Sequence, residues 1–204
     1  MILAGGFSKR FGQDKGSVRL AGKPLILYVV DVVSKLVDDI VVVANSKKQR
    51  EAFADLFGRK AVVAVDKYEK RSPLVGALTG FEKVQGDYSL LLPCDTPFVS
   101  SQIASLLLDL CVNRNAAVPR WPNGYIEPLQ AVYHTKSALA AAEKAVGQDR
   151  LELRSMIANL SKVRYVSTTV LRQVNPKLLT FFNVNTPEDL KKAESILKRI
   201  KMKG

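Results

Sequence analysis

Three glycines and three basic residues are concentrated in the first fifteen positions of the chain. Gly5, Gly6 and Gly12 follow a short apolar run, and Arg10 and Lys15 stand within the same stretch. Glycine lets a loop turn tightly and approach a ligand closely, because no Cβ intervenes. The free N–H groups of such a loop form an anion-binding concavity, to which Arg and Lys add positive charge. We interpret this loop as a cradle for a triphosphate.

The spacing of these glycines differs from that of two familiar phosphate-binding loops. The stretch contains no G-x-x-x-x-G-K-[ST], and its glycines do not form G-x-G-x-x-G. A Gly-Gly pair after an apolar run can also be no more than a turn. The loop's own basic residues, and its position directly after the first expected strand, favour phosphate binding.

Two aspartates follow apolar runs that are typical of buried strands. Asp66 comes after residues 61–65, and Asp95 comes after residues 88–92. Ligands of an open α/β sheet bind beyond the carboxyl ends of its strands, so we expect both aspartates to face the glycine loop.

Asp95 is the better candidate for a metal ligand. It stands between Pro93 and Pro97, whose fixed φ angles hold the backbone stiffly. Mg²⁺ is commonly bound by one or two carboxylates together with phosphate oxygens and waters. The alternative is that Asp95 only forms an Asx-turn with the backbone that follows it.

The elements that must position these residues alternate between strand and helix. We expect helices over residues 25–36 (with Pro24 at the first helical position), 47–57, 73–84 and about 100–110, and strands over residues 40–44, 61–65 and 88–92. This alternation predicts βαβ units, a parallel sheet and an α/β fold. The second half is less regular, with strands expected over 116–118, 125–133 and 162–166, helices over 135–146 and 151–160, and a final helix capped by Thr186.

Length and composition indicate one globular domain. The chain has 204 residues, of which 47% are hydrophobic, so a single domain over residues 1–204 can bury a sizeable core. The net charge of +12 indicates anionic partners such as nucleotides, phosphorylated metabolites or nucleic acids.

The scarcity of cysteine and histidine excludes several kinds of site. Cys94 and Cys111 form neither a C-x-x-C motif nor a metal-ligand spacing, and Cys94 is expected to be a small buried side chain. With His134 as the single histidine, a zinc site or a Ser-His-Asp triad is hard to build, and His134 is expected to flank a helix. We expect a reduced, cytoplasmic protein without a membrane helix or a signal peptide.

The lysine-rich stretch from Lys191 to Lys203 could in principle contact nucleic acid. It carries Ile196, Leu197 and Ile200 on one face, which favours an amphipathic helix with a solvated outer side. Aromatic residues are not interleaved with its basic residues, and no binding motif occurs there. We therefore expect no nucleic-acid partner.

The sequence resembles the nucleotidyltransferases of the molybdenum cofactor guanylyltransferase (MobA) type. The residues that carry the resemblance run through the chain in order: Leu3-Ala4-Gly5-Gly6, Asp14-Lys15, Gly22-Lys23-Pro24-Leu25, Ser72-Pro73-Leu74-Val75-Gly76, Pro93-Cys94-Asp95-Thr96-Pro97, Glu127-Pro128-Leu129-Gln130-Ala131-Val132-Tyr133 and Asn183-Val184-Asn185-Thr186-Pro187-Glu188-Asp189-Leu190. Ser72 replaces a glycine of the family pattern, and some members place an additional asparagine at the position of Val43.

The resemblance implies a fold and a set of site residues. The fold is a three-layer, doubly wound, mostly parallel sheet of the Rossmann-like nucleotidyltransferase type. Asp95 matches the family's Mg²⁺ ligand. Leu3, Ala4, Gly5, Gly6, Lys15, Asp66 and Asp95 match the nucleotide side, Lys15, Asp95 and Arg10 are the candidate catalytic residues, and Glu127, Asn183 and Asn185 would shape the pterin side.

The resemblance also implies the reaction. GTP and the molybdopterin-type cofactor would give the guanine dinucleotide form of the cofactor and pyrophosphate, and proteins that deliver or accept the cofactor are possible partners. Gly5 favours GTP, because cytidylyl relatives tend to carry Ala at that position. The alternatives are a sister enzyme that uses CTP or a sugar phosphate, a non-catalytic nucleotide-binding protein and, last, a basic nucleic-acid-binding protein.

Overall fold

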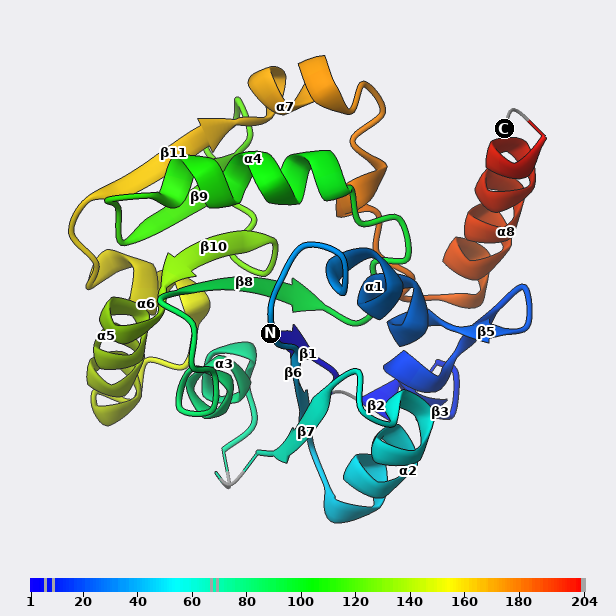
Figure 1. Cartoon of the computed structure of the whole chain (residues 1–204), viewed down its shortest axis with the longest axis horizontal. Coiled ribbons are helices and arrows are strands. Elements are labelled where there is room, and N and C mark those ends of the chain that lie inside the picture. Colours follow the sequence, from blue (N-terminus) through cyan, green and yellow to red (C-terminus); the bar gives the residue numbers. More distant parts are fainter. Residues whose placement is uncertain (6, 9, 67, 69, 203–204) are drawn as a thin grey trace.

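A seven-stranded sheet forms the centre of the molecule (Figure 1). The computed structural model describes residues 1–5, 7–8, 10–66, 68 and 70–202. The strands lie in the order β11-β9-β10-β8-β1-β6-β7, and their bounds are β1 Ile2–Leu3, β6 Val41–Ala44, β7 Val62–Val65, β8 Tyr88–Pro93, β9 Ala116–Arg120, β10 Ala131–His134 and β11 Val163–Ser167. β10 is antiparallel to β8 and β9, whereas the other pairings in this sheet are parallel. The predicted mostly parallel α/β sheet is confirmed.

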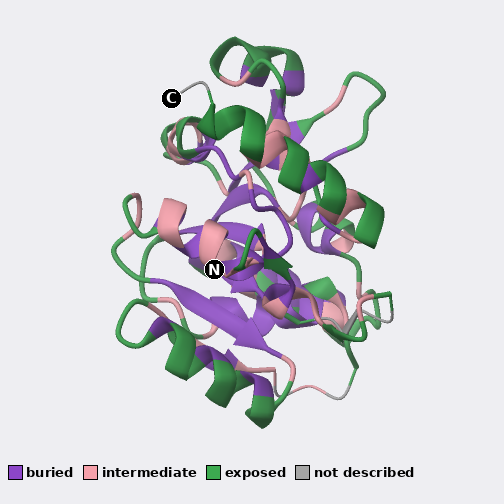
Figure 2. Ribbon diagram, turned by 90° about the vertical axis from the view of Figure 1, so that its right-hand side faces the viewer, coloured by how far each residue is buried: buried purple, intermediate pink, exposed green. Residues whose placement is uncertain are grey.

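Helices cover both faces of the sheet and give three layers. One face packs against α1 (Leu25–Val33), α2 (Lys47–Phe57), α4 (Ser101–Cys111) and α7 (Thr168–Val174), and the other against α3 (Pro73–Phe81), α5 (Thr135–Gly147) and α6 (Leu153–Ala158). Alternating residues of each strand enter opposite cores, because successive side chains of a strand point to opposite faces. Ile2 and Ala4 belong to the first core, and Met1 and Leu3 belong to the second. The central strands are accordingly buried, whereas the edge strands β7 and β11 and the outer helix surfaces are partly exposed (Figure 2).

A third, smaller apolar cluster joins the start of the chain to its end. The hairpins β2 (Phe7–Ser8) with β3 (Gln13–Asp14) and β4 (Arg19–Leu20) with β5 (Lys23–Pro24) follow β1, with the short 3₁₀ helix η1 (Lys15–Ser17) between them. Val18, Leu20 and Leu25 pack against Val184 and Ala193, the latter from α8 (Pro187–Lys201). This contact brings the segment before α8 next to the loop that carries Lys15.

The first helix differs from the sequence-based expectation in two features. Pro24 is the N-cap of α1 rather than its first helical residue, because it also pairs with Arg19 in the β4–β5 hairpin. The same helix ends at Val33 instead of Leu36. Residues beyond Val33 form turns whose N–H groups still bond to Val32 and Val33 carbonyls, so the apolar pattern extends past the regular helix.

The second half differs more. The strand expected over 125–133 reduces to β10 and an isolated bridge between Arg120 and Ile126, because Gln130 N donates to Glu127 O at 3.2 Å and closes a turn there. α7 was not predicted. It contains several β-branched residues of low helix propensity, and it begins where Ser167 Oγ accepts from Thr169 N. Among the described residues, no helix combines the length and hydropathy that a membrane crossing requires.

Candidate active site

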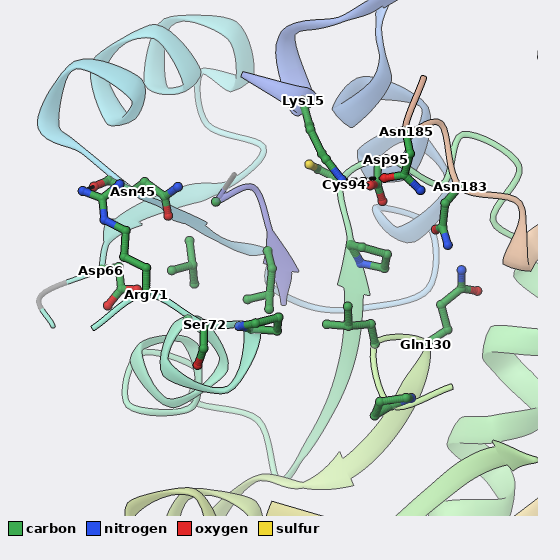
Figure 3. A pocket seen from close by; sticks show the side chains of 18 of the residues that line it. Lys15, Asn45, Asp66, Arg71, Ser72, Cys94, Asp95, Gln130, Asn183 and Asn185 are labelled. Carbon is green, nitrogen blue, oxygen red and sulfur yellow. Dashed lines mark hydrogen bonds and ion pairs between the residues drawn. The ribbon is translucent and has the colours of Figure 1, made fainter. Parts of the chain in front are cut away.

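A cavity of about 570 Å³ lies beyond the carboxyl ends of the parallel strands (Figure 3). Gly5 follows β1, Asn45 follows β6, Asp66 follows β7 and Asp95 follows β8, and all four line this cavity. Residues 127–130 also line it, because β10 is antiparallel and therefore begins at the same edge of the sheet. The sheet topology thus gathers five separate segments around one space.

Lys15 and Asp95 meet inside this cavity. Lys15 Nζ lies 3.1 Å from Asp95 Oδ2 and donates a second hydrogen bond, of 2.6 Å, to Asn185 Oδ1. The side chain of Lys15 keeps 30% of its surface exposed, whereas that of Asp95 keeps 10%. Val184 N donates to the carbonyl of Asp95 at 2.9 Å, which fixes the backbone of the aspartate against the segment before α8. Lysine and carboxylate are therefore preorganised, with part of the lysine side chain exposed.

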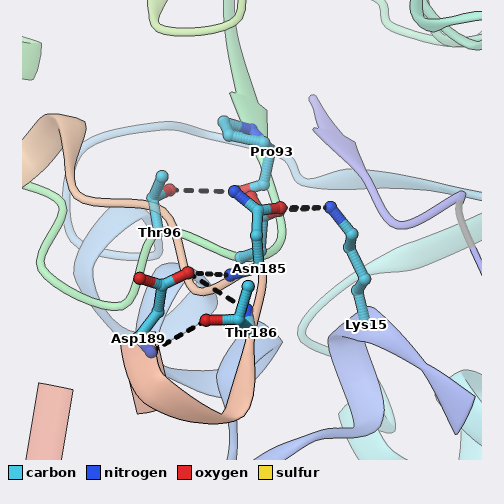
Figure 4. A network of polar contacts seen from close by, with 7 residues as sticks. Lys15, Pro93, Thr96, Asn185, Thr186 and Asp189 are labelled. Carbon is cyan, nitrogen blue, oxygen red and sulfur yellow. Dashed lines mark hydrogen bonds and ion pairs between the residues drawn. The ribbon is translucent and has the colours of Figure 1, made fainter. Parts of the chain in front are cut away.

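A capping box holds Asn185 in this position (Figure 4). Asp189 Oδ2 accepts from the backbone N–H groups of Asn185 and Thr186 at 3.1 and 3.0 Å, and Thr186 Oγ1 accepts from Asp189 N at 3.1 Å. Such reciprocal bonds satisfy donors that the first helical turn leaves unpaired. The start of α8 therefore positions the asparagine that receives the Lys15 hydrogen bond. The N-cap predicted at Thr186 and the acid at Asp189 are confirmed.

Gly5 and Asn45 form one wall of the cavity at very close range. A Cβ atom added to Gly5 would lie 2.2 Å from Asn45 Oδ1, so this position accepts only glycine unless Asn45 moves. Gln49, which is 4% exposed, fixes the two segments relative to each other. Its Oε1 accepts from Asn45 N at 2.7 Å and its Nε2 donates to the carbonyl of Ala4 at 3.0 Å.

Asp66 presents a partly satisfied carboxylate at the same end of the cavity. Its Oδ1 accepts from Thr79 Oγ1 at 3.1 Å and from Tyr68 N at 3.2 Å. Arg71 also lines this end, and its guanidinium donates to the carbonyl of Asn45 at 3.4 Å. The carboxylate of Asp66 and the guanidinium of Arg71 therefore offer a hydrogen-bond acceptor and donor at this side of the cavity (Figure 3).

Glu127 provides a carboxylate at the other end. Its Oε1 accepts from Trp121 Nε1 at 2.7 Å. Burial raises the pKa of Glu127, and the Trp121 hydrogen bond opposes part of that rise. Tyr125, 51% exposed, lines the same region, and the guanidinium carbon of Arg154 lies 5.2 Å from its ring centroid.

Comparison with known proteins identifies the family. The sequence model described as the MobA-like NTP transferase domain matches residues 1–163. The chain belongs to this family.

Individual relatives are similar in sequence to this protein along nearly its whole length. A molybdenum cofactor guanylyltransferase of Desulfosudis oleivorans is 36% identical, over 97% of this chain and 95% of that protein. A probable molybdenum cofactor guanylyltransferase of Natranaerobius thermophilus is 31% identical over the same shares. The crystal structure of molybdopterin-guanine dinucleotide biosynthesis protein A from Archaeoglobus fulgidus superposes with a TM-score of 0.83 and 29% identity, over 97% of both chains. The resemblance and the fold stated from the sequence are confirmed.

Most of the predicted site residues of this MobA-like chain come together. The cavity lining includes Leu3, Gly5, Lys15, Asp66, Asp95, Glu127, Asn183 and Asn185. Ala4 is fully buried in the core beneath the loop. Arg10 is exposed on the turn between β2 and β3 and does not line the cavity. Gly6 lies outside the described residues.

The lining also contains polar residues to which no sequence motif of this MobA-like chain assigned a role, among them Asn45, Arg71 and Gln130. Asn45 directly follows a buried strand, so the rule that located Asp66 and Asp95 could also have found it. Arg71 precedes a helix and Gln130 lies in an irregular turn, and neither has a comparable signal in the sequence.

The part of the MobA-like chain that the structure describes contains no group of three or more His, Cys, Asp or Glu side chains arranged to hold a metal ion. A cage made only of protein ligands is therefore not available in that part. A single buried carboxylate such as Asp95 suits a metal ion that shares its coordination with phosphate oxygens and water. Cys94 is 3% exposed beside it, and burial raises the pKa of its thiol, which favours the predicted structural role over a nucleophilic one.

Proposed function

We propose that this protein transfers GMP from GTP to the terminal phosphate of the molybdenum cofactor, giving the guanine dinucleotide cofactor and pyrophosphate. Family membership and the similarity to molybdenum cofactor guanylyltransferases support the activity. The structural observation that carries the proposal is the contact of Lys15 Nζ with Asp95 Oδ2, 3.1 Å apart, in a cavity at the carboxyl edge of the sheet.

Nucleotidyltransferases of this family generally use a divalent metal ion. We assign Mg²⁺ here, held by Asp95 together with phosphate oxygens of the nucleotide. When bound, the ion would neutralise charge on the α-phosphate and on the leaving pyrophosphate.

The residues of the chain would act mainly by positioning and charge. A phosphate oxygen of the cofactor attacks the α-phosphorus of GTP, a new P–O bond forms, and the bond to the β-phosphate oxygen breaks to release pyrophosphate. The attacking oxygen is already ionised at neutral pH, so the step needs no general base. His134, the single histidine, caps α5 and does not line the cavity. Lys15 would stabilise the charge that develops on the transferred group.

The order of the strands supports separate ends of the cavity for the two substrates. Asp66 follows β7 and residues 127–130 precede β10, with β6, β1 and β8 between them. Neighbouring strands lie about 4.8 Å apart, so these two ends are separated by about 19 Å. That span accommodates a nucleotide on the Asp66 side, the transferred phosphate near Asp95, and a pterin on the Glu127 side.

We assign the remaining residues on this basis. Leu3, Ala4, Gly5, Gly6 and Asp66 would contact the nucleotide, and Glu127, Asn183 and Asn185 would contact the pterin side. Arg10 would reach the triphosphate only after its exposed side chain turns toward the cavity. Because Asn185 comes from the segment before α8 and Lys15 from the first loop, we propose that residues 1–204 work as one domain. We also propose that this protein receives the cofactor from one protein and passes the product to another.

The test is a reconstitution with purified protein, GTP, Mg²⁺ and the molybdenum cofactor. We expect pyrophosphate release and formation of the guanine dinucleotide, identified by mass. Replacing GTP with CTP, or removing the metal with EDTA, should abolish release. Tight GTP binding without any pyrophosphate release would instead identify a nucleotide-binding protein without catalysis, and release with CTP would identify a cytidylyl enzyme.

A further inference from the structure

We propose that Glu127, held in place by Trp121, recognises the aminopyrimidinone edge of the pterin in the second substrate. The inference rests on the proposed function, because that function supplies the pterin. The edge consists of a ring N–H and the neighbouring amino group, which are two parallel donors. A carboxylate can accept two such donors at once, as it does from the guanidinium of arginine.

The placement of Glu127 in the cavity favours the pterin over the nucleotide. Glu127 and Gln130 belong to the segment that precedes β10. Among the strands whose ends line the cavity, β10 stands at one end of the row. In Figure 3, Asn45, Asp66 and Arg71 lie at one side of the cavity, and Gln130 lies with Asn183 at the other. Lys15 and Asp95 mark the position of the phosphates in the proposed reaction. A heterocycle next to Glu127 therefore belongs to the substrate that does not occupy the Asp66 side.

The orientation of Glu127 is fixed by contacts on both its backbone and its side chain. Glu127 N donates to Pro119 O at 2.9 Å, and Glu127 O accepts from Gln130 N at 3.2 Å. Trp121 Nε1 donates to Glu127 Oε1 at 2.7 Å. A carboxylate that is preorganised in this way loses little conformational entropy when it binds its ligand.

Trp121 is itself held by its surroundings. Its backbone N–H donates to Tyr125 O at 2.7 Å, and its carbonyl accepts from Gly124 N at 2.9 Å. Its ring lies edge-on to Phe181, with 5.8 Å between the centroids. Trp121 does not line the cavity, so we assign it as a positioning residue that acts through Glu127.

The carboxylate of Glu127 retains unused acceptor capacity. Within the part of the chain that the structure describes, Oε2 receives no hydrogen bond, and Oε1 receives only the one from Trp121. Glu127 is half-buried, and an acceptor withdrawn from water gains free energy when a donor reaches it. Tyr125, Pro128 and Leu129 line the adjacent surface and offer the apolar contact that a flat heterocycle requires.

The competing interpretation is that Glu127 only satisfies the indole N–H of Trp121. Two soluble probes separate the two interpretations. Pterin-6-carboxylate carries the amino group, and lumazine-6-carboxylate carries an oxygen in its place, so the pair differs at the edge that Glu127 would recognise. Both are titrated by calorimetry into the full-length wild-type protein and into the variants Glu127→Gln, Trp121→Phe and Glu143→Gln. Glu143 is exposed on α5 and does not line the cavity, so its variant is the matched control.

We expect the wild-type protein and the Glu143→Gln variant to bind the pterin at least about tenfold more tightly than the lumazine. Glu127→Gln keeps the shape of the side chain but places an amide donor against the ligand's donors, so the pterin preference should disappear. Trp121→Phe should weaken pterin binding about threefold to tenfold while the preference persists. In the transfer assay, both variants should raise KM for the cofactor and leave kcat and the KM for GTP unchanged.

A wild-type protein that binds both probes equally, or a Glu127→Gln variant that keeps the full preference, would overturn the inference. A separate titration with GTP tests the proposed function independently. If GTP does not bind while the pterin preference depends on Glu127, the proposed function fails and the recognition by Glu127 stands.

Discussion

Lys15 Nζ and Asp95 Oδ2 are 3.1 Å apart although eighty positions separate the two residues in the chain. The proximity follows from the parallel pairing of β1 with β8, since Lys15 begins η1 in the segment after β1 and Asp95 lies two residues beyond β8. The contact is an ion pair between an ammonium group and a carboxylate. In the proposed reaction the two groups act on the same phosphates, so the ion pair keeps both in position until the nucleotide arrives.

The first prediction concerns Asp95. Asp95→Asn removes the charge but keeps the size of the side chain, and it should lower kcat about 10²-fold or more if the carboxylate holds the metal ion. Its hydrogen-bonding partners remain available, so the thermal midpoint should change little. Pyrophosphate release measures the first quantity and calorimetric unfolding the second. Asp109→Asn, on the outer part of α4, is the control and should retain full activity. A fully active Asp95→Asn protein would remove the metal ligand from the proposal.

The second prediction concerns the contact between Gly5 and Asn45. Gly5→Ala should destabilise the fold by about 1–3 kcal/mol, because the new methyl group would lie 2.2 Å from Asn45 Oδ1. Asn45→Ala removes the obstructing atoms, so the double variant should recover most of this loss. Urea unfolding of the four proteins completes a double-mutant cycle. Purely additive effects would show that the methyl group finds space elsewhere.

Much of this site could be anticipated from the sequence because simple rules apply to its parts. Asp66 and Asp95 each follow an uninterrupted apolar run, and the carboxyl ends of parallel strands meet at one edge of a sheet. The helix that positions Asn185 was also predictable, because Thr186, Pro187 and Asp189 form a recognisable start signal.

Other features depend on contacts that no local pattern encodes. Gln49 reads as an ordinary polar residue of α2, and only the folded chain shows that it is buried and bonded to the carbonyl of Ala4. Arg10 has the right charge for a phosphate ligand, yet the β2–β3 hairpin leaves it exposed. β10 is shorter than the strand predicted over 125–133, because the chain before Ala131 closes a turn that contains Pro128.

The third prediction follows from Gln49. Gln49→Leu keeps much of the side-chain volume but leaves the Asn45 N–H and the Ala4 carbonyl without their partner. Each group lost in this way costs about 1–3 kcal/mol, so unfolding should occur at a clearly lower urea concentration. The KM for GTP should rise as well, because the wall formed by Gly5 and Asn45 loosens. Lys48→Ala, exposed on the same helix, should change neither quantity. Unchanged stability of Gln49→Leu would show that water replaces both bonds.

The last prediction concerns pH. Burial raises the pKa of Glu127 above its ordinary value of 4.5, so the carboxyl group takes up a proton at a higher pH than a free glutamate does. The folded state then binds more protons than the unfolded state in the window between 4.5 and the raised pKa. The contribution of Glu127 to stability is therefore fully present below that window and is lost as the pH rises through it. Binding of the pterin should have the opposite dependence, because only the ionised carboxylate accepts both donors of the ligand. Calorimetric titrations with pterin-6-carboxylate across this window should show affinity rising with pH in the wild-type protein and staying flat in Glu127→Gln. A parallel rise in both proteins would assign the titration to another group.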